Sequence, residues 1–399
     1  VLFPGWGVGL NPSEITIAKL LKQGGYATQL IGKWHCGDQP EFLPTNHGFD
    51  GYFGIPYSND MGRQAENPDG LTLEVLTKMV RDIGCEEPFI RPPLPVLLDQ
   101  EVVEAQPDQA ALTERYVEHA VDFMRSNRGQ PFFLYFAHMY VHLPIYVQDK
   151  FRELSTNGDY GAAVRCIDWA AEALFAELHD LGLDDDTIVI FTSDNGALDA
   201  TRGGSGSNGE LRGAKGSTWD GGQRVPCIVR WPGHVAAGVE CNQLATAMDL
   251  YPTLAGLAGV EIPDDRTIDG NDIGALLGLD ASEVDESRDF FFIKAANIEA
   301  VRRGTWKLHV SRNGDDIIEL YDLGADVGEQ HNVATGHPDV VADLMDRINA
   351  GRAALGDERL GITGAEVRPI GRVDDPQPLT HFDPEHPYFM AEYDLHHRG

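Results

Sequence analysis

A cation and a titratable imidazole stand two residues apart after a short apolar segment. Lys33 and His35 follow the segment YATQLI, which begins at Tyr26. Residues at that spacing point to the same side of an extended chain, so both side chains could enter one cavity while Trp34 packs on the other side. A cation beside an imidazole suits an anionic substrate. A solvated surface loop explains this stretch equally well when it is taken alone.

Polar side chains also follow two further apolar segments. PFFLYFAH ends at His138 and leads to His142, and DDTIVIFTSDNG ends in Asp194 and Asn195. Ligands collect at the carboxyl ends of strands in open α/β sheets, so these groups would converge if the strands are parallel neighbours. Carboxylate and amide oxygens suit calcium or magnesium, but two are too few for calcium, which takes about six to eight. The alternatives are an Asx turn for Asp194 and Asn195 and a packed histidine for His142.

A glycine-rich segment follows the last of these strands. Nine glycines lie between Gly196 and Gly222, enough for the backbone to approach a ligand closely or to make several tight turns. Lys215 in this segment is a further candidate cation, and an exposed lysine is the alternative. Ser58 carries almost no signal of its own.

Helices alternate with these strands, which predicts an α/β architecture. We expect one helix from an N-cap at Asn11 to Gly24, and longer helices over residues 108–126 and 160–181. The apolar run at residues 131–137 is typical of a strand that is buried on both faces.

The pattern changes after Glu261. Short antiparallel strands are expected between residues 290 and 322 and a helix over 339–355, which together indicate a small α+β subdomain. The expected division is a large α/β domain at residues 1–284, this subdomain at 285–360, and an irregular tail at 361–399.

The chain has 399 residues and a formal net charge of −32, from 31 basic and 63 acidic residues. Such acidity argues against nucleic acid as a partner, and any anionic substrate must be held by a local cluster of cations. No apolar run approaches the roughly 20 residues of a membrane span. Five cysteines without regular spacing do not indicate a disulfide framework. Neither the compartment nor the oligomeric state can be read from the sequence, and position 1 is a valine with no signal peptide before it.

Taken together, the motifs resemble the sulfatase family, most closely the branch of arylsulfatase A and N-acetylgalactosamine-6-sulfatase. GYATQLIGKWHCG is similar to the family signature Gly-Tyr-x-Thr-x-x-x-Gly-Lys-x-His, with every signature position kept. The resemblance continues in family order through GFDGYFGIPYSNDMG, PFFLYFAHMYVHLP, FTSDNG, GAKGSTWDGGQRVP and TWKLHV…ELYDL. It implies an alkaline-phosphatase-like fold, with a large mixed sheet between helices and a small C-terminal antiparallel sheet.

The resemblance also implies roles for individual residues. Lys33 and His35 match the lysine and histidine beside the family's nucleophile, and His142 matches the histidine near the ester oxygen. Substrate contacts are implied for Ser58 and Lys215, as well as for Lys33 and His142. The implied activity is hydrolysis of an aryl or carbohydrate sulfate ester, in a periplasmic, secreted or lysosomal-type compartment. His138 has no catalytic counterpart and is expected to be structural.

The resemblance implies two cofactors, of which this sequence carries only part. Asp194 and Asn195 match two ligands of a calcium ion. The family's nucleophile is a formylglycine made within Cys/Ser-x-Pro/Ala-x-Arg, and no cysteine or serine here begins that pattern. The Asp-Asp pair that supplies further calcium ligands is also absent, and in the family both lie upstream of VLFPGWGVGL. We therefore expect an N-terminal truncation, and a fragment that lacks activity, binds calcium poorly and exposes part of its core.

Two other functions fit the same motifs. One is a phosphodiesterase or phosphatase of the same superfamily, which would favour a threonine or serine nucleophile and two metals. The other is a non-catalytic relative that binds sulfate esters without turnover.

Overall fold

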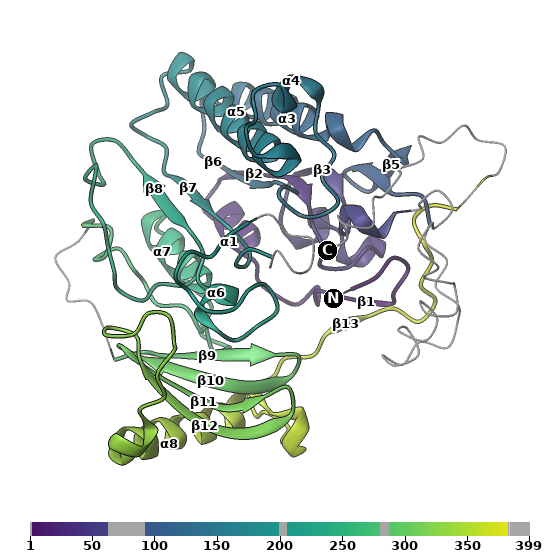
Figure 1. Cartoon of the computed structure of the whole chain (residues 1–399). Helices are drawn as coiled ribbons and strands as arrows, with labels where there is room; N and C mark the ends of the chain where they lie inside the picture. Colours follow the sequence, from purple (N-terminus) through teal and green to yellow (C-terminus); the bar gives the residue numbers. More distant parts are fainter. Residues whose placement is uncertain (1, 63–91, 199–205, 280–286, 382, 384–399) are drawn as a thin grey trace. The chain divides into compact units, whose positions relative to one another are not determined.

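The computed structural model describes residues 2–62, 92–198, 206–279, 287–381 and 383 (Figure 1). Its contacts divide the chain into two compact units, which are described separately below. The first unit comprises residues 1–183, 257–262 and 370–399, and the second comprises residues 184–256 and 263–369.

The first unit is built on a five-stranded mixed sheet with strand order β5-β4-β3-β2-β6. The three strands β2 (Ala27–Lys33), β3 (Gly51–Ile55) and β6 (Phe132–Ala137) are parallel neighbours. β4 (Pro95–Leu98) and β5 (Glu101–Ala105) extend the sheet in antiparallel pairing. The sheet therefore brings the carboxyl ends of β3, β2 and β6 to one edge.

Helices pack on both faces of this sheet. Tyr52 of β3 is buried in an apolar cluster with a residue of α1 (Ile17–Gln23). The next residue, Phe53, meets the ring of Tyr116 on α3 (Leu112–Ser126) at a centroid distance of 6.0 Å. Successive strand residues point to opposite faces, so α1 and α3 cover different sides of the sheet.

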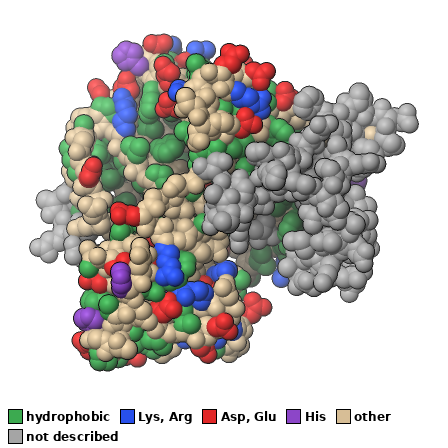
Figure 2. Space-filling model, viewed as in Figure 1, with side chains coloured by type: hydrophobic (Ala, Val, Ile, Leu, Met, Phe, Trp, Pro, Cys, Tyr) green, Lys and Arg blue, Asp and Glu red, His purple; other side chains and the backbone are tan. Residues whose placement is uncertain are grey.

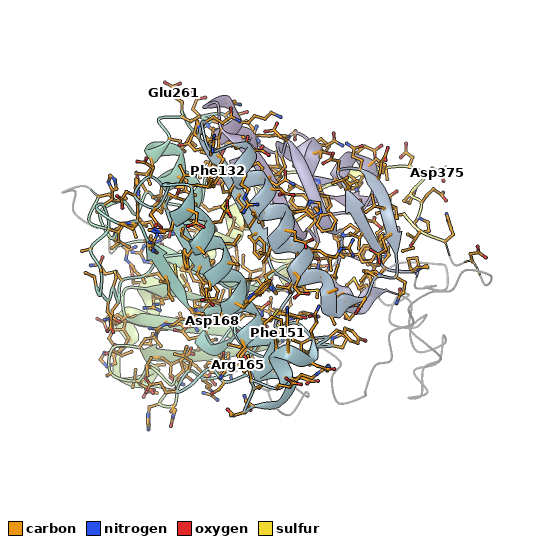
Figure 3. All side chains as sticks on the ribbon, turned by 90° about the horizontal axis from the view of Figure 1, so that it is seen from above. Phe132, Phe151, Arg165, Asp168, Glu261 and Asp375 are labelled. Carbon is orange, nitrogen blue, oxygen red and sulfur yellow. The ribbon has the colours of Figure 1, made fainter. Side chains whose placement is uncertain are left out.

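Two further helices complete this layer. α5 (Gly158–Asp180) packs along α3, and the short α4 (Asp149–Arg152) packs on α5 through Phe151 (Figure 3). The buried residues of α5 are mostly apolar, apart from Glu177, which pairs with Arg125 of α3, whereas Arg165 and Asp168 are exposed. This is the amphipathic pattern of a helix that covers another helix.

Helix α1 begins later than the sequence predicts. Its N-cap is Thr16, whose Oγ1 accepts a hydrogen bond from the Lys19 amide and donates one to the His47 carbonyl. Asn11 instead accepts a hydrogen bond from the Ser13 amide at 3.0 Å, which closes a local turn. The predicted N-cap at Asn11 was therefore wrong, because a tertiary contact made Thr16 the better cap. The predicted end at Gly24 is confirmed.

The prediction that the apolar strand at residues 131–137 is buried on both faces was also wrong. β6 pairs with β2 on one side, and no other strand among the described residues pairs with it. Its side chains are mostly half-buried, and Tyr135 is 51% exposed. Apolar side chains also reach the surface on the face seen in Figure 2, where acidic side chains are scattered. An apolar run alone does not separate a central strand from an edge strand.

The second unit contains a two-stranded antiparallel sheet formed by β7 (Val189–Thr192) and β8 (Cys227–Arg230). The short α6 (Asp220–Gln223) precedes β8, and α7 (Leu250–Leu257) follows it. Both strands lie where the sequence predicts them. Within the described part of the chain, β7 pairs with β8 alone and not with the parallel strands of the first unit.

A four-stranded antiparallel sheet forms the rest of this unit, with strand order β12-β11-β10-β9. The strands are β9 (Asp289–Lys294), β10 (Asn297–Arg303), β11 (Trp306–Arg312) and β12 (Asp315–Asp322). α8 (Pro338–Leu355) packs on it, and its buried Leu344 and Ile348 join the core of the sheet. The predicted C-terminal antiparallel sheet and helix are thus confirmed.

The remaining strands, β1 (Val8–Gly9) and β13 (Gly371–Arg372), form an antiparallel pair between the two ends of the chain. In the described part of the protein, no helix has the length and hydropathy needed to cross a bilayer. The α/β fold class, with helices on a mixed sheet and a separate antiparallel sheet, is confirmed. The division at residues 284 and 360 stays a prediction.

Candidate active site

The structure places one set of candidate residues at a single edge of the first unit's sheet. Lys33 is the last residue of β2 and lies opposite Ile55, the last residue of β3. His35 follows β2, Ser58 follows β3, and His142 follows β6, the other parallel neighbour of β2. These residues therefore leave three adjacent strands in the same direction, which is the arrangement that binds ligands in open α/β sheets.

Two glycines allow the strands to approach closely just before this edge. A Cβ atom on Gly32 would lie 2.0 Å from the carbonyl oxygen of Ala137, and one on Gly54 would lie 1.8 Å from the carbonyl oxygen of Gly32. Gly32 also has φ of +113°, which disfavours any other residue. The glycine of the signature thus has a steric reason that is independent of any ligand.

His35 is shaped by burial and by a neighbouring cation. Its Nε2–H donates to the carbonyl oxygen of Leu2 at 3.0 Å, which leaves Nδ1 without a proton in the neutral ring. Burial lowers the pKa of His35 to about 4, and the positive charge of Lys33 acts in the same direction. The imidazole is therefore neutral at pH 7 and can accept a proton at Nδ1.

The reason given above for pairing Lys33 with His35 was wrong. His35 is not in extended backbone, because it has φ of +58° and its amide donates to the carbonyl oxygen of Pro56 at 3.0 Å. The rule that residues two apart point the same way therefore does not apply here. The two side chains are still close enough for the charge of Lys33 to act on His35. Trp34 packs against the core as expected, with Nε1–H bonded to the Phe42 carbonyl at 2.8 Å.

Ser58 and the two histidines after β6 differ in their surroundings. Ser58 is 2% exposed, and its Oγ makes no hydrogen bond within the described residues. His142 donates from Nδ1 to the Leu143 carbonyl at 2.6 Å, so the proton of the neutral ring lies on Nδ1. His138 uses both nitrogens internally, on the Tyr140 amide at 3.0 Å and on Thr113 Oγ1 at 3.2 Å. These contacts agree with a structural role for His138.

The second set of candidates lies in the second unit. Asp194 is exposed, and the neighbouring Asn195 donates from Nδ2 to the Gly196 carbonyl at 3.0 Å, which leaves its Oδ1 as an acceptor. Lys215 is half-buried, and its amide donates to the carbonyl oxygen of Ala197 at 3.0 Å. The backbone therefore ties the segment of Lys215 to the segment of Asp194 and Asn195.

The calcium expectation can be tested against these donors. Asp194 and Asn195 offer oxygens of the right kind for a hard cation, but two oxygens do not complete a calcium shell of about six to eight. The part of the chain that the structure describes contains no group of three or more histidine, cysteine or acidic side chains that could hold a metal ion. The described residues thus fit calcium only in part.

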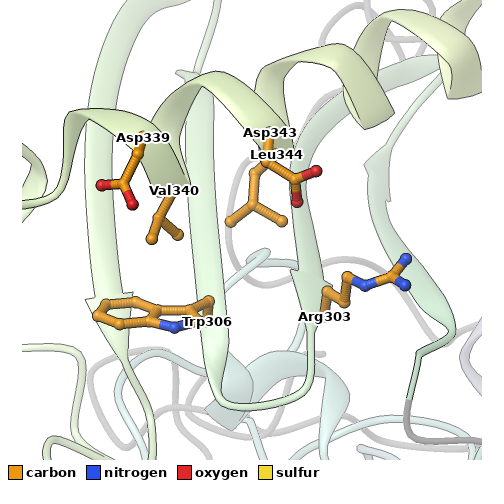
Figure 4. Close-up of a pocket in the computed structure, with 6 residues that line it drawn as sticks. All are labelled: Arg303, Trp306, Asp339, Val340, Asp343 and Leu344. Carbon is orange, nitrogen blue, oxygen red and sulfur yellow. The ribbon is translucent and has the colours of Figure 1, made fainter.

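Two cavities in the second unit are lined by none of these candidate residues. One of about 210 Å³ lies between α8 and the strands β10 and β11 (Figure 4). The other, of about 470 Å³, lies further along α8. The residues that line the first are Arg303, Trp306, Asp339, Val340, Asp343 and Leu344. Sequence reasoning did not single out these positions, and they carry no recognisable motif.

Sequence reasoning also missed a buried cluster of charges in the second unit. Lys307, His309 and Glu329 are fully buried, and Asp220 nearly so. Lys307 lies in the segment TWKLHV and Asp220 in GAKGSTWDGGQRVP. Both segments carry the family resemblance, but neither their charges nor the likeness itself indicates burial.

Comparison with known proteins supports the family resemblance of the sequence motifs. A family model described as Sulfatase matches residues 3–260, and one described as N-sulphoglucosamine sulphohydrolase, C-terminal, matches residues 214–354. The chain is 36% identical over 364 residues to arylsulfatase A of Homo sapiens, covering 84% of this chain and 70% of that protein. It is 36% identical over 315 residues to N-acetylgalactosamine-6-sulfatase of Rattus norvegicus, covering 76% of this chain and 55% of that protein.

A solved structure extends the similarity to the fold. The crystal structure of Ps i-CgsB in complex with k-i-k-neocarrahexaose matches with a TM-score of 0.71 at 28% sequence identity. The match covers 87% of this chain and 76% of that one.

Proposed function

Because this chain belongs to the sulfatase family, we propose that it acts in the hydrolysis of a sulfuric ester, with an aryl or carbohydrate sulfate as substrate. The observation that carries the proposal is the set of signature residues at the carboxyl ends of β2, β3 and β6. A carbohydrate ester is supported by the similar protein Ps i-CgsB, whose structure is a complex with k-i-k-neocarrahexaose. Since the matched relatives are longer than this chain, the activity is proposed for the protein that carries the complete catalytic set.

The first unit would supply the proton transfers. We assign His35 as the base, because its Nδ1 is unprotonated at neutral pH and can take a proton from a hydroxyl. Lys33 places a positive charge beside it, which favours an anionic group nearby. His142 is assigned as the acid, which in its protonated imidazolium form gives a proton to the leaving oxygen, and Ser58 as a hydroxyl contact to substrate.

The second unit would supply charge for the sulfate. Lys215 is assigned to a sulfate oxygen, with Asp194 and Asn195 as two ligands of a calcium ion. Calcium would neutralise the ester's oxygens, and a formylglycine would supply the nucleophile, whose motif these 399 residues do not contain. The compartment proposed from the family is periplasmic, secreted or lysosomal in type.

The experiment compares a sulfate ester with the phosphate ester of the same alcohol, with calcium present. The expected result is turnover of the sulfate ester at least about 100-fold faster, since a phosphatase would reverse this order. A stable protein that binds the sulfate ester without turning it over would instead support a non-catalytic relative. Either of these two results would overturn the proposal.

A second measurement tests the acid role of His142. His142→Ala should lower kcat for an ester with a poor leaving group by about 10²–10⁴-fold, because general acid catalysis contributes that much. The loss should be far smaller for an activated aryl sulfate, whose alcohol departs without a proton. Equal losses on both esters would contradict the assignment.

A further inference from the structure

The buried charges of the second unit have no role in the function proposed above. The Nζ of Lys307 lies 2.8 Å from Asp220 Oδ1 and 2.8 Å from Glu329 Oε1. His309 donates from Nε2 to the same Glu329 oxygen at 3.1 Å. Removing charged groups from water is costly, so their burial needs pairing of this kind. The cluster therefore fixes the relative position of the segments from which its members come.

One of these segments is the loop that precedes α6. Oε2 of Glu329 accepts a hydrogen bond from the Asp220 amide at 2.8 Å. The carbonyl oxygen of Glu329 accepts one from Arg212 Nη1 at 2.6 Å, and the Arg212 carbonyl accepts one from the Gly221 amide at 2.8 Å. The guanidinium of Arg212 also lies 3.8 Å from the ring centre of Trp219. Glu329 thus binds the loop on both sides of its turn.

The loop held in this way carries Lys215. Its far side is bonded to the segment after Asp194, through Lys215 amide to Ala197 carbonyl at 3.0 Å and Gly196 amide to Gly222 carbonyl at 3.1 Å. Hydrogen bonds and short stretches of backbone therefore link the buried charges to the backbone of Lys215 and to Gly196 and Ala197, which directly follow Asn195. All of these residues lie in the second unit.

The charge state of Glu329 suits this arrangement. Burial alone would raise its pKa, but the hydrogen bond from His309 and the charge of Lys307 outweigh burial and lower it. The carboxylate is therefore ionised at neutral pH and can accept the bonds from Lys307, His309 and the Asp220 amide.

We propose that Glu329 and Lys307 are positioning residues, which hold the loop of Lys215 in the place where that lysine binds sulfate. The part of the inference that concerns sulfate binding rests on the proposed function, whereas the part that concerns the position of the loop does not. Both side chains are fully buried, so they act through the backbone of the loop and not on the substrate directly.

The first test follows the loop itself by hydrogen–deuterium exchange in the variant Glu329→Gln, which keeps the shape of the side chain and removes its charge. Exchange at the amides of Lys215, Asp220 and Gly221 should accelerate at least about tenfold, because the bonds that close the loop are weakened. The matched control is Asp357→Asn, which breaks the buried Arg352–Asp357 pair (3.0 Å) of the same unit. The control should leave exchange at the three loop amides unchanged.

The second test is a double-mutant cycle on a sulfate ester. If Glu329 acts through Lys215, Glu329→Gln should raise KM about tenfold in the natural background and have almost no effect in the Lys215→Ala background. Losses that simply add would show that Glu329 is only structural. If Glu329→Gln fails to fold, Arg212→Met replaces it, because Arg212 is exposed and still links the loop to Glu329.

The two tests separate the two proposals. Unchanged exchange at the loop amides in Glu329→Gln would overturn the positioning inference, whatever the activity. Faster exchange, together with a Lys215→Ala variant that hydrolyses sulfate esters normally, would support the role of Glu329 in holding the loop and overturn the assigned role of Lys215.

Discussion

The two units hold their proposed catalytic groups by different means. In the first unit, Lys33 and His35 stand at the end of a central parallel strand, and burial decides the protonation of the imidazole. In the second unit, Asp194 is exposed and Lys215 half-buried, and hydrogen bonds of a glycine-rich loop hold their backbone. The buried charges there belong to Lys307 and its partners.

The difference follows from what each group is proposed to do. A base must be neutral to accept a proton, and removal from water keeps an imidazole neutral. A group that binds an anion or a metal must keep its charge and reach the ligand, so it stays accessible while its backbone is made rigid. Packing on the sheet keeps His35 neutral, and the hydrogen-bonded loop keeps the backbone of Lys215 rigid while its side chain stays accessible.

The largest expected effect is a loss of stability when strands β2 and β6 can no longer approach closely near their carboxyl ends. Gly32→Ala would place a Cβ atom 2.0 Å from the Ala137 carbonyl oxygen, at a backbone φ of +113°. We expect it to lower the free energy of unfolding by more than about 3 kcal/mol, measured by urea denaturation. Gly129→Ala, with open space around the new atom, is the control and should change it by less than about 0.5 kcal/mol. Equal midpoints for the two variants would contradict the packing argument.

The next effect separates the two regions by their kinetics. His35→Ala should lower kcat by about 10²–10⁴-fold, the usual contribution of a positioned base. Lys215→Ala should act mainly on KM, by about 10–100-fold, because a charged hydrogen bond to sulfate is lost in substrate and transition state alike. Steady-state kinetics of the catalytically active protein measure both. If both variants changed the same parameter, the division of labour between the regions would be wrong.

Acid should weaken the first unit before the second. Burial lowers the pKa of His35, His47 and His138 to about 4, from an ordinary value of 6.5. Between pH 6.5 and 4 the unfolded chain therefore binds protons that the folded unit does not, and stability falls as the pH falls. In the second unit, the lowered pKa of Glu329 contributes stability that is lost only below its ordinary value of 4.5, although burial also lowers the pKa of His309.

Amide exchange measured unit by unit between pH 7 and 4 checks this order. Protection should decrease first in the sheet of the first unit. Three histidines of that unit have a strongly lowered pKa, whereas the second unit has His309. Simultaneous loss of protection in both units would show that the histidines do not control the acid response.

The smallest effect concerns the charge of Lys33. Lys33→Met removes the positive charge beside His35, so the pKa of His35 should rise. It should stay well below 6.5, because burial is the larger cause of the shift. An NMR titration of the His35 ring measures the change. Lys22→Met, which removes an exposed lysine of the same unit that pairs with Asp50, should leave the titration unchanged.

Local pattern was sufficient for most of the elements and failed where a distant contact decided. The helix predicted over residues 108–126 is found at Leu112–Ser126, and the strands of the C-terminal sheet lie where they were predicted. The start of α1 did not, because Thr16 becomes the cap through its bond to His47, which is 31 residues away. The position of β6 at the end of the described sheet could not be predicted either, because apolar composition does not determine which strands pair with it.

The sequence by itself determined the family, the alternation of helices and strands, and the candidate residues at the strand ends. These depend on residue types at short spacing, which the chain displays without folding. Only the tertiary structure decided that His35 leaves the strand in a left-handed conformation with a pKa near 4, and that Lys307, Asp220 and Glu329 meet in one buried cluster. The physical reason is that burial and pairing are properties of groups brought together from distant positions, and no local pattern records them.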